Sequence, residues 1–201
     1  MVFTKIKSYA KINLALNITG KSLSLHKIET IVAFIDLYDV IKIRRIKSNT
    51  HQISFDGKFS KNIGKNNTVF KLLKILKNKN FLKKDKFQIK INKKIPSSAG
   101  MGGGSMNAAN ILKYFVEKKI IKASKAEIIK ISKLIGSDVI FGLKSTYSIL
   151  TSANKIKYFP NCKKIQILVV KPNFGCSTKG IYSKVRKFSK PKIKKPNKNM
   201  F

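Results

Sequence analysis

Residues 95–110 read Ile-Pro-Ser-Ser-Ala-Gly-Met-Gly-Gly-Gly-Ser-Met-Asn-Ala-Ala-Asn, and the rest of the chain can be placed around this glycine-rich stretch. Before it, Phe87, Ile89 and Ile91 alternate with polar residues, which predicts a half-buried strand. After it, apolar residues recur at helical spacing, which predicts a helix that starts near Ser105. Glycine lets a backbone approach a phosphate closely, and a helix N-terminus favours negative charge. We therefore predict an anion-binding loop, with a flexible turn as the alternative.

Two common phosphate-binding motifs do not match this loop. No Lys-Ser or Lys-Thr pair follows the last glycine, as a Walker A motif requires. The spacing Gly100-x-Gly102-x-x-Ser105 lacks the third glycine of the dinucleotide fingerprint. No acidic residue lies about 20 positions further on, where that fingerprint places one on the ribose. Neither of these two motifs therefore accounts for the loop.

The net charge of +36 raises the question of nucleic-acid binding. All but three of the 44 basic residues are lysine, and they are spread along the whole chain. Proteins that read bases rely on the forked guanidinium of arginine, which is nearly absent here. We interpret the charge as compositional bias that also suits a polyanionic substrate. A basic RNA-binding domain stays an alternative, and we expect no specific nucleic-acid binding.

Composition and segment patterns indicate a globular protein of the cytoplasm. A hydrophobic content of 43% is enough for one core, and no apolar run is long enough for a transmembrane helix. The N-terminus has no apolar segment typical of a secretory signal. Cys162 and Cys176 are too few for a disulfide scaffold and do not sit at metal-binding spacing. We expect a reducing compartment and no membrane partner.

Hydrophobic periodicity predicts the other elements. Strands are expected at 5–18, 28–46, 50–56, 146–151 and 165–171, and the 28–46 run is expected to break into two strands near Asp36–Asp39. Helices are expected at 68–78, capped by Asn67, and between Ser124 and Gly136, where Ser124-x-x-Glu127 is a capping box. The polar tail from residue 183 is expected to be disordered. Several adjacent strands with loosely alternating helices predict an α+β fold.

Three stretches together resemble the GHMP kinases, and most of all the 4-diphosphocytidyl-2-C-methyl-D-erythritol kinases. The stretches are Ala10-Lys11-Ile12-Asn13-Leu14, the glycine loop, and Gly136-Ser137-Asp138-Val139, and they occur in the family's order. Weaker matches are His26 with Glu29-Thr30, the Asp36–Asp39 turn, and Thr178 with Tyr182. The resemblance implies a mixed sheet with helices packed on it, similar to the second domain of ribosomal protein S5. Another GHMP small-molecule kinase stays an alternative.

The resemblance also implies an ATP- and Mg²⁺-dependent transfer of a phosphoryl group to a hydroxyl of diphosphocytidyl-methylerythritol. It makes Asp138 the catalytic base and Lys11 its partner, which is chemically sensible because the hydroxyl must lose its proton. The nucleotide would be bound by the loop, with Ser105 also available to Mg²⁺, and Asn67 would lie near the adenine or serve only as a helix cap. The loop residues implied are Pro96, Ser97, Ser98, Ala99, Gly100, Met101, Gly102, Gly103, Gly104 and Ser105.

The resemblance assigns Asn13, His26, Thr178 and Tyr182 to substrate binding, with His26 and Tyr182 on the cytosine. The chain departs from the family pattern at Leu25, where a Tyr is usual, at Met106, where a Ser is usual, and at Ile140, where a Pro is usual. We expect residues 1–182 to form the ATP-binding domain. Residues 183–201 are expected to begin the connection to a C-terminal domain that this sequence lacks.

Overall fold

The computed structural model describes residues 2–22, 26–61, 63–162, 165–172, 175 and 178–201. The chain forms two compact units, and each is described by itself. The first unit contains residues 1–10, 35–97 and 102–144, and the second contains residues 11–34, 98–101 and 145–201. Strands β1 (Thr4–Lys21) and β2 (His26–Ile46) are long enough to contribute to both units.

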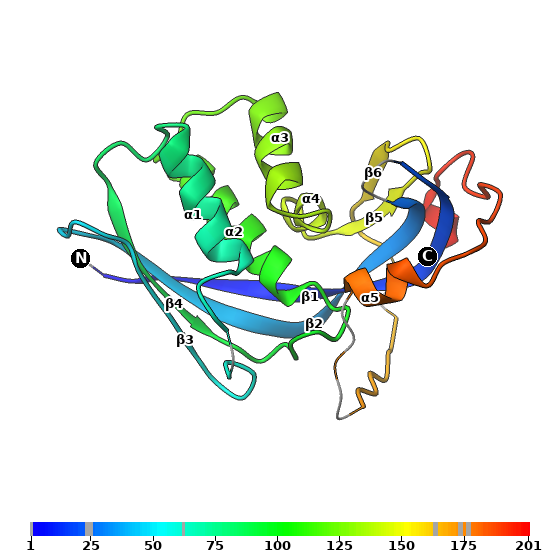
Figure 1. The fold of residues 1–201 in the computed structure, drawn as a ribbon, viewed down its shortest axis with the longest axis horizontal. Helices are drawn as coiled ribbons and strands as arrows, with labels where there is room; N and C mark the ends of the chain where they lie inside the picture. Colours follow the sequence, from blue (N-terminus) through cyan, green and yellow to red (C-terminus); the bar gives the residue numbers. More distant parts are fainter. Residues whose placement is uncertain (1, 23–25, 62, 163–164, 173–174, 176–177) are drawn as a thin grey trace. The chain divides into compact units, whose positions relative to one another are not determined.

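The sheet of the first unit combines both strand directions. The second half of β2 pairs antiparallel with β4 (Lys86–Asn92), from Val40 opposite Asn92 to Ile46 opposite Lys86. Strand β3 (Gln52–Asp56) pairs with β4 in parallel. Helices α1 (Thr68–Asn78), α2 (Gly103–Glu117) and α3 (Lys125–Ile135) lie on one face of this sheet (Figure 1). A mixed sheet with helices on it confirms the predicted α+β fold.

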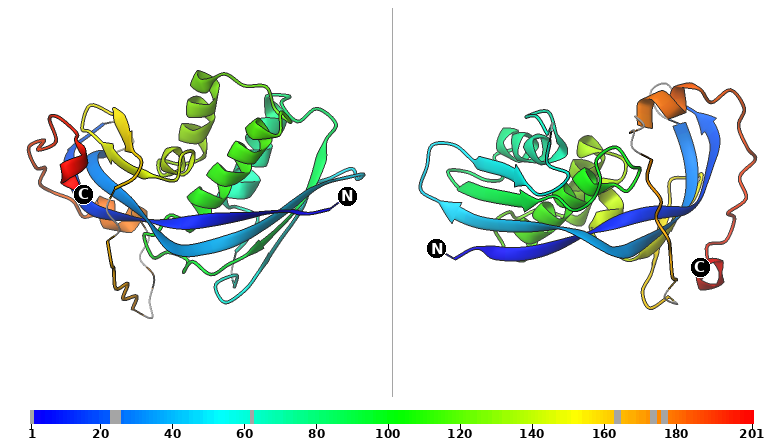
Figure 2. Two further views of the ribbon diagram at one scale, coloured as in Figure 1. Left: turned by 180° about the vertical axis from the view of Figure 1, so that it is seen from behind. Right: turned by 90° about the horizontal axis from the view of Figure 1, so that it is seen from below.

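The core of the first unit lies between this sheet and its helices (Figure 2). Alternate residues of β2 and β4 point into it, as the sequence alternation predicted, and the Phe87 and Phe115 rings lie 4.8 Å apart. Helices begin where their caps predicted. Asn67 accepts hydrogen bonds from the Val69 and Phe70 amides, and Ser124 forms the capping box with Glu127.

The second unit is built on the first half of β2. Strand β5 (Tyr147–Leu150) pairs antiparallel with residues Thr30–Val32 and with β6 (Ile156–Phe159). Its small core contains Ile31, Ile149, Phe159 and Ile193. Helix α5 (Thr178–Ser183) and the short 3-10 helix η1 (Lys198–Met200) complete this unit.

The prediction that the tail from residue 183 is disordered is wrong. The backbone amides of Lys192 and Ile193 donate to the carboxylate of Glu29 at 2.7 and 3.0 Å. The Phe201 ring packs edge-on against Tyr147, with ring centroids 5.0 Å apart. The apolar residues of the tail are too widely spaced to give a periodic pattern, so their packing depends on acceptors and rings elsewhere in the second unit.

Two strand predictions are also wrong. Strand β2 continues through Asp36–Asp39 without a break, and the Asp39 carboxylate is buried and accepts hydrogen bonds from the Lys94 and Ile95 amides. The described residues 165–171 form no strand, whereas β6, which the sequence did not predict, pairs with β5. Leu168 and Val170 are 88% and 80% exposed, so the apolar, β-branched run has strand propensity without a partner strand in the described chain.

Candidate active site

The glycine loop contains three residues with a left-handed backbone. Ser98, Gly100 and Gly102 have φ angles of 53°, 71° and 66°. Gly102 is the N-cap of α2, and no side chain caps this helix end. The first backbone N–H groups of an uncapped helix are available to an anion, and the helix dipole favours negative charge there. The helix start predicted near Ser105 is found two residues earlier, at Gly103.

Close packing explains the next two glycines of the loop. A Cβ atom on Gly103 would lie 3.0 Å from Cγ2 of Ile95, and one on Gly104 would lie 3.1 Å from Oγ1 of Thr68. Thr68 also donates a hydrogen bond to the Gly104 carbonyl at 2.6 Å. The start of α1 is therefore hydrogen-bonded to the start of α2, which places Asn67 near the last loop residues, 102–105, within the first unit.

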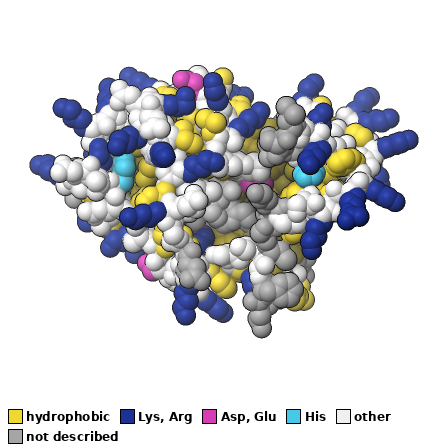
Figure 3. All heavy atoms as spheres, viewed as in Figure 1, with side chains coloured by type: hydrophobic (Ala, Val, Ile, Leu, Met, Phe, Trp, Pro, Cys, Tyr) yellow, Lys and Arg dark blue, Asp and Glu magenta, His cyan; other side chains and the backbone are white. Residues whose placement is uncertain are grey.

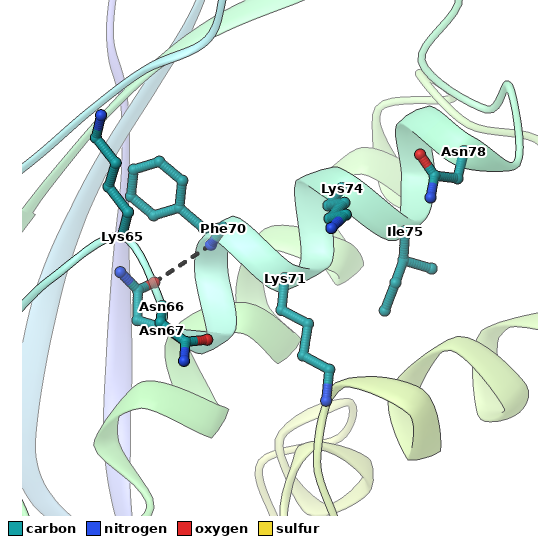
Figure 4. Close-up of a pocket in the computed structure, with 8 residues that line it drawn as sticks. All are labelled: Lys65, Asn66, Asn67, Phe70, Lys71, Lys74, Ile75 and Asn78. Carbon is teal, nitrogen blue, oxygen red and sulfur yellow. Dashed lines mark hydrogen bonds between the residues drawn. The ribbon is translucent and has the colours of Figure 1, made fainter.

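A cavity of about 680 Å³ lies along α1, with lining residues from Lys65 before the helix to Asn78 at its end (Figure 4). Asn67, Phe70 and Ile75 line it together with lysines, and Lys65 and Phe70 also line a neighbouring cavity of about 290 Å³. Asn67 caps α1 through its Oδ1 atom and donates through Nδ2 to the Gly64 carbonyl at 2.7 Å. The predicted helix-cap role of Asn67 is thus confirmed, and its predicted place near an adenine stays a prediction.

The Gly136–Val139 motif lies beside the end of the glycine loop. A Cβ atom on Gly136 would lie 3.8 Å from Oγ of Ser105. Asp138, half-buried, stands at the N-cap position of the short helix α4 (Val139–Gly142). The Gly136–Val139 motif therefore meets the end of the glycine loop within the first unit, where Gly136 lies next to the Ser105 hydroxyl.

The N-terminal motif forms a hydrogen-bond chain in the second unit. Lys11 is 4% exposed and donates from Nζ to Oδ1 of Asn13 at 2.7 Å. Asn13 in turn donates to Oγ1 of Thr30 at 2.7 Å, and Thr30 donates to the Ala15 carbonyl. Lys11 and Asn13 share one face of β1, as the alternation predicted. The backbone amide of Lys11 also donates to the Met101 carbonyl of the loop at 3.1 Å.

The aromatic residues assigned to the cytosine lie together in the second unit. The rings of His26 and Tyr182 have centroids 5.1 Å apart and are tilted by 38°, and the Phe188 ring lies 6.4 Å from His26. Thr178 begins α5, but its side chain lies outside the described part of the chain, as does Leu25. The encounter of Lys11 with Asp138, which belong to different units, stays a prediction.

The other loop residues have mixed environments. Met101 is buried, whereas Ser97, Ser98 and Gly100 are exposed and Pro96 and Ala99 are half-buried. The hydroxyl of Ser97 donates to the Phe59 carbonyl at 3.3 Å. Their assignment to nucleotide binding stays a prediction.

The sequence reasoning missed a buried ion pair beneath the loop. Asp39 is fully buried and Lys93 is 4% exposed, and the two side chains form a salt bridge. Asn107 of α2 donates to the same carboxylate at 2.9 Å. The available signal was the alternation in β2, because Asp39 falls on the same face as Ile41 and Ile43.

Basic side chains are distributed widely over the surface. Figure 3 shows lysine and arginine side chains spread over the visible face. Nucleic-acid-binding proteins usually gather such side chains in one patch or stripe. Among the described residues, no group of three or more His, Cys, Asp or Glu side chains could hold a metal ion. None of the described helices has the length and apolar character needed to cross a membrane.

Comparisons with known proteins show the family of this chain. The family model for the GHMP kinases N terminal domain matches residues 67–148. The 4-diphosphocytidyl-2-C-methyl-D-erythritol kinase of Pelagibacter ubique is 59% identical over 98% of this chain, which spans 70% of that relative. The enzyme of the same name from Clostridium beijerinckii is 36% identical over 89% of this chain, which spans 63% of that relative.

A solved structure shows the same fold. The crystal structure of a 4-(cytidine 5'-diphospho)-2C-methyl-D-erythritol kinase matches with a TM-score of 0.69 and 22% sequence identity. The match covers 92% of this chain and 66% of that one. The mixed sheet and its helices are therefore an arrangement that a much more distant sequence also adopts.

Proposed function

This chain belongs to the 4-diphosphocytidyl-2-C-methyl-D-erythritol kinase family, and we propose that it carries the ATP-binding and phosphoryl-transfer machinery for a cytidine-linked alcohol. The observation that carries the proposal is that the end of the glycine loop, at Gly104 and Ser105, contacts both the start of α1 and the Gly136–Val139 motif within the first unit. Residues 1–182 would form the ATP-binding domain. The alternatives, another GHMP kinase or a basic RNA-binding domain, have no specific observation in their favour.

In the proposed reaction, the nucleotide phosphates bind at the uncapped start of α2. The adenosine lies along the cavity beside Asn67 and Phe70, whose polar and aromatic side chains suit a purine. The substrate hydroxyl attacks the γ-phosphorus, the bond from that phosphorus to the bridging oxygen breaks, and ADP leaves. Asp138 accepts the proton that the hydroxyl loses.

Lys11 would stabilise the charge that develops on the transferred group, and it is already oriented by Asn13. The same Asn13, with His26 and Tyr182, would bind the cytidine-linked alcohol in the second unit. Mg²⁺ would neutralise phosphate charge when bound. The Ser105 hydroxyl, in the first turn of α2, fits an ion that takes few protein ligands and binds mainly through phosphates and water.

The proposal is tested with Asp138→Asn and Lys11→Ala in this chain, by measuring ADP release with the cytidine-linked alcohol and ATP affinity separately. Loss of the base should lower turnover by about 10²–10⁴-fold with ATP affinity nearly unchanged. Lys21→Ala, at an exposed position at the end of β1, is the matched control and should retain turnover. Full turnover in Asp138→Asn, or a loss of ATP affinity as large as the loss of turnover, would contradict the mechanism.

A further inference from the structure

The carboxylate of Asp39 lies in an unusual place for a charge. It is 0% exposed and stands on the core face of β2, two and four residues before the buried Ile41 and Ile43. Burial of an ionised carboxylate is strongly unfavourable unless its oxygens are paired and hydrogen-bonded. Its retention in the core therefore requires a full set of donors, and the identity of these donors shows what the carboxylate holds in place.

The donors come from both sides of the glycine loop. Oδ1 accepts from the backbone amides of Lys94 and Ile95, at 2.8 and 2.9 Å, directly before the loop. Oδ2 accepts from Nζ of Lys93 and from Nδ2 of Asn107, at 2.9 Å for the amide, within the first turns of α2. All of these residues belong to the first unit. One side chain thus ties the strand that enters the loop to the helix that leaves it.

The Lys93 ammonium lies beneath the first residue of that helix. A Cβ atom on Gly103 would lie 3.2 Å from Nζ of Lys93 and 3.0 Å from the side chain of Ile95. The position of Gly103, and hence of the first N–H groups of α2, is therefore set by residues that Asp39 holds. Without the carboxylate, Lys93 would be a buried cation without its partner, and residues 94–95 would lose two backbone hydrogen bonds.

We propose that Asp39 is a positioning residue for phosphate binding, and that together with Asn107 it fixes the start of α2 against the strand before the loop. The inference rests on the proposed function, because it assigns Asp39 a role in holding the nucleotide phosphates. Asp39 is buried and acts only through Lys93, residues 94–95 and Asn107. Its effect should therefore be felt by the triphosphate and not by the adenosine beside α1.

Two variants separate positioning from folding. Asp39→Asn preserves shape and an acceptor for the two backbone amides but loses the charge that pairs with Lys93. Asn107→Ala removes only the link to α2 and leaves the salt bridge intact, so it serves if Asp39→Asn fails to fold. Ile43→Val, on the same buried face of β2, is the control for a general loss of core packing.

The measurement is calorimetric titration of each variant with a non-hydrolysable ATP analogue plus Mg²⁺, and separately with adenosine. We expect Asp39→Asn and Asn107→Ala to bind the analogue at least about tenfold more weakly than the wild type, which is the factor for one lost charge-assisted hydrogen bond. Adenosine affinity should be unchanged, and Ile43→Val should bind both like the wild type. The positioning role alone would be overturned if Asp39→Asn and Asn107→Ala both bound the analogue within about twofold of the wild type. It would also be overturned if their affinity for adenosine fell as much as their affinity for the analogue. A wild-type chain that binds no analogue would overturn the proposed function as well.

Discussion

Replacement of Gly142 by alanine is expected to destabilise the first unit, because α4 packs directly on α2 at this glycine. A Cβ atom at position 142 would lie 2.5 Å from Cβ of Ala109 and 3.1 Å from Sδ of Met106. Carbon atoms normally meet at about 3.5–4.0 Å, so α4 would have to move by about 1 Å. The Met106 side chain can adjust, but the Ala109 Cβ is fixed to the α2 backbone.

Overpacking of this kind costs about 1–3 kcal/mol, and the better helix propensity of alanine offsets at most about 1 kcal/mol. With a mid-range cost of about 2 kcal/mol and an offset of up to about 1 kcal/mol, the free energy of unfolding should fall by about 1–2 kcal/mol, which lowers the melting temperature by about 2–8 °C for a chain of this size. Because α4 follows Asp138, its displacement would also move the proposed base. Turnover should therefore fall in Gly142→Ala.

Stability is best measured by urea titration followed by circular dichroism, since the chain contains no tryptophan. Gly64→Ala is the matched control because a Cβ atom there meets nothing within 4 Å, so it should change stability by less than about 0.5 kcal/mol. The double variant Ala109→Gly with Gly142→Ala should be more stable than the sum of its single changes by about 1 kcal/mol. Wild-type stability in Gly142→Ala, or strict additivity in the double variant, would refute the packing argument.

Two further predictions concern the second unit: the pH dependence of stability due to Glu29, and the small effect of replacing the exposed Leu168 compared with Leu72 in the core of the first unit. Burial raises the pKa of Glu29, but hydrogen bonds from Asn17 and from the Lys192 and Ile193 amides outweigh burial and lower this pKa from its usual 4.5. The ionised carboxylate therefore stabilises the fold above pH 4.5, and this stabilisation is lost as the pH falls through the lowered pKa. In Glu29→Gln, the free energy of unfolding from urea titration should therefore fall less on acidification below pH 4.5 than in the wild type. The same pH dependence of this free energy in both proteins would contradict the role of Glu29. Leu168→Ser, at a side chain that is 88% exposed, should change the free energy of unfolding by less than about 0.5 kcal/mol. Leu72→Ala, at a fully buried position, should lower it by about 2–5 kcal/mol in the same urea titration, and equal effects at the two sites would show that residues 165–170 are packed.

Local chemistry was sufficient to predict several elements from the sequence. The Asn67 cap and the Ser124–Glu127 capping box each satisfy backbone groups a few residues away, so their pattern alone predicts a helix start. The glycine loop was predictable for the same reason, since a strand, glycines and a helix start follow one another in the chain. The side-by-side placement of Lys11 and Asn13 followed from the two-residue period of a strand.

Contacts between distant residues could be decided only by the tertiary structure. The donors to Asp39 lie 54 to 68 positions away along the chain, so a residue that the sequence placed in a turn is in fact buried and hydrogen-bonded. The tail residues that donate to Glu29 lie more than 160 positions away. The run at 165–170 shows the converse, because strand propensity does not form a strand without a neighbour that supplies hydrogen bonds. A sequence states which groups need partners, and only the fold determines which partners come within about 3 Å of them.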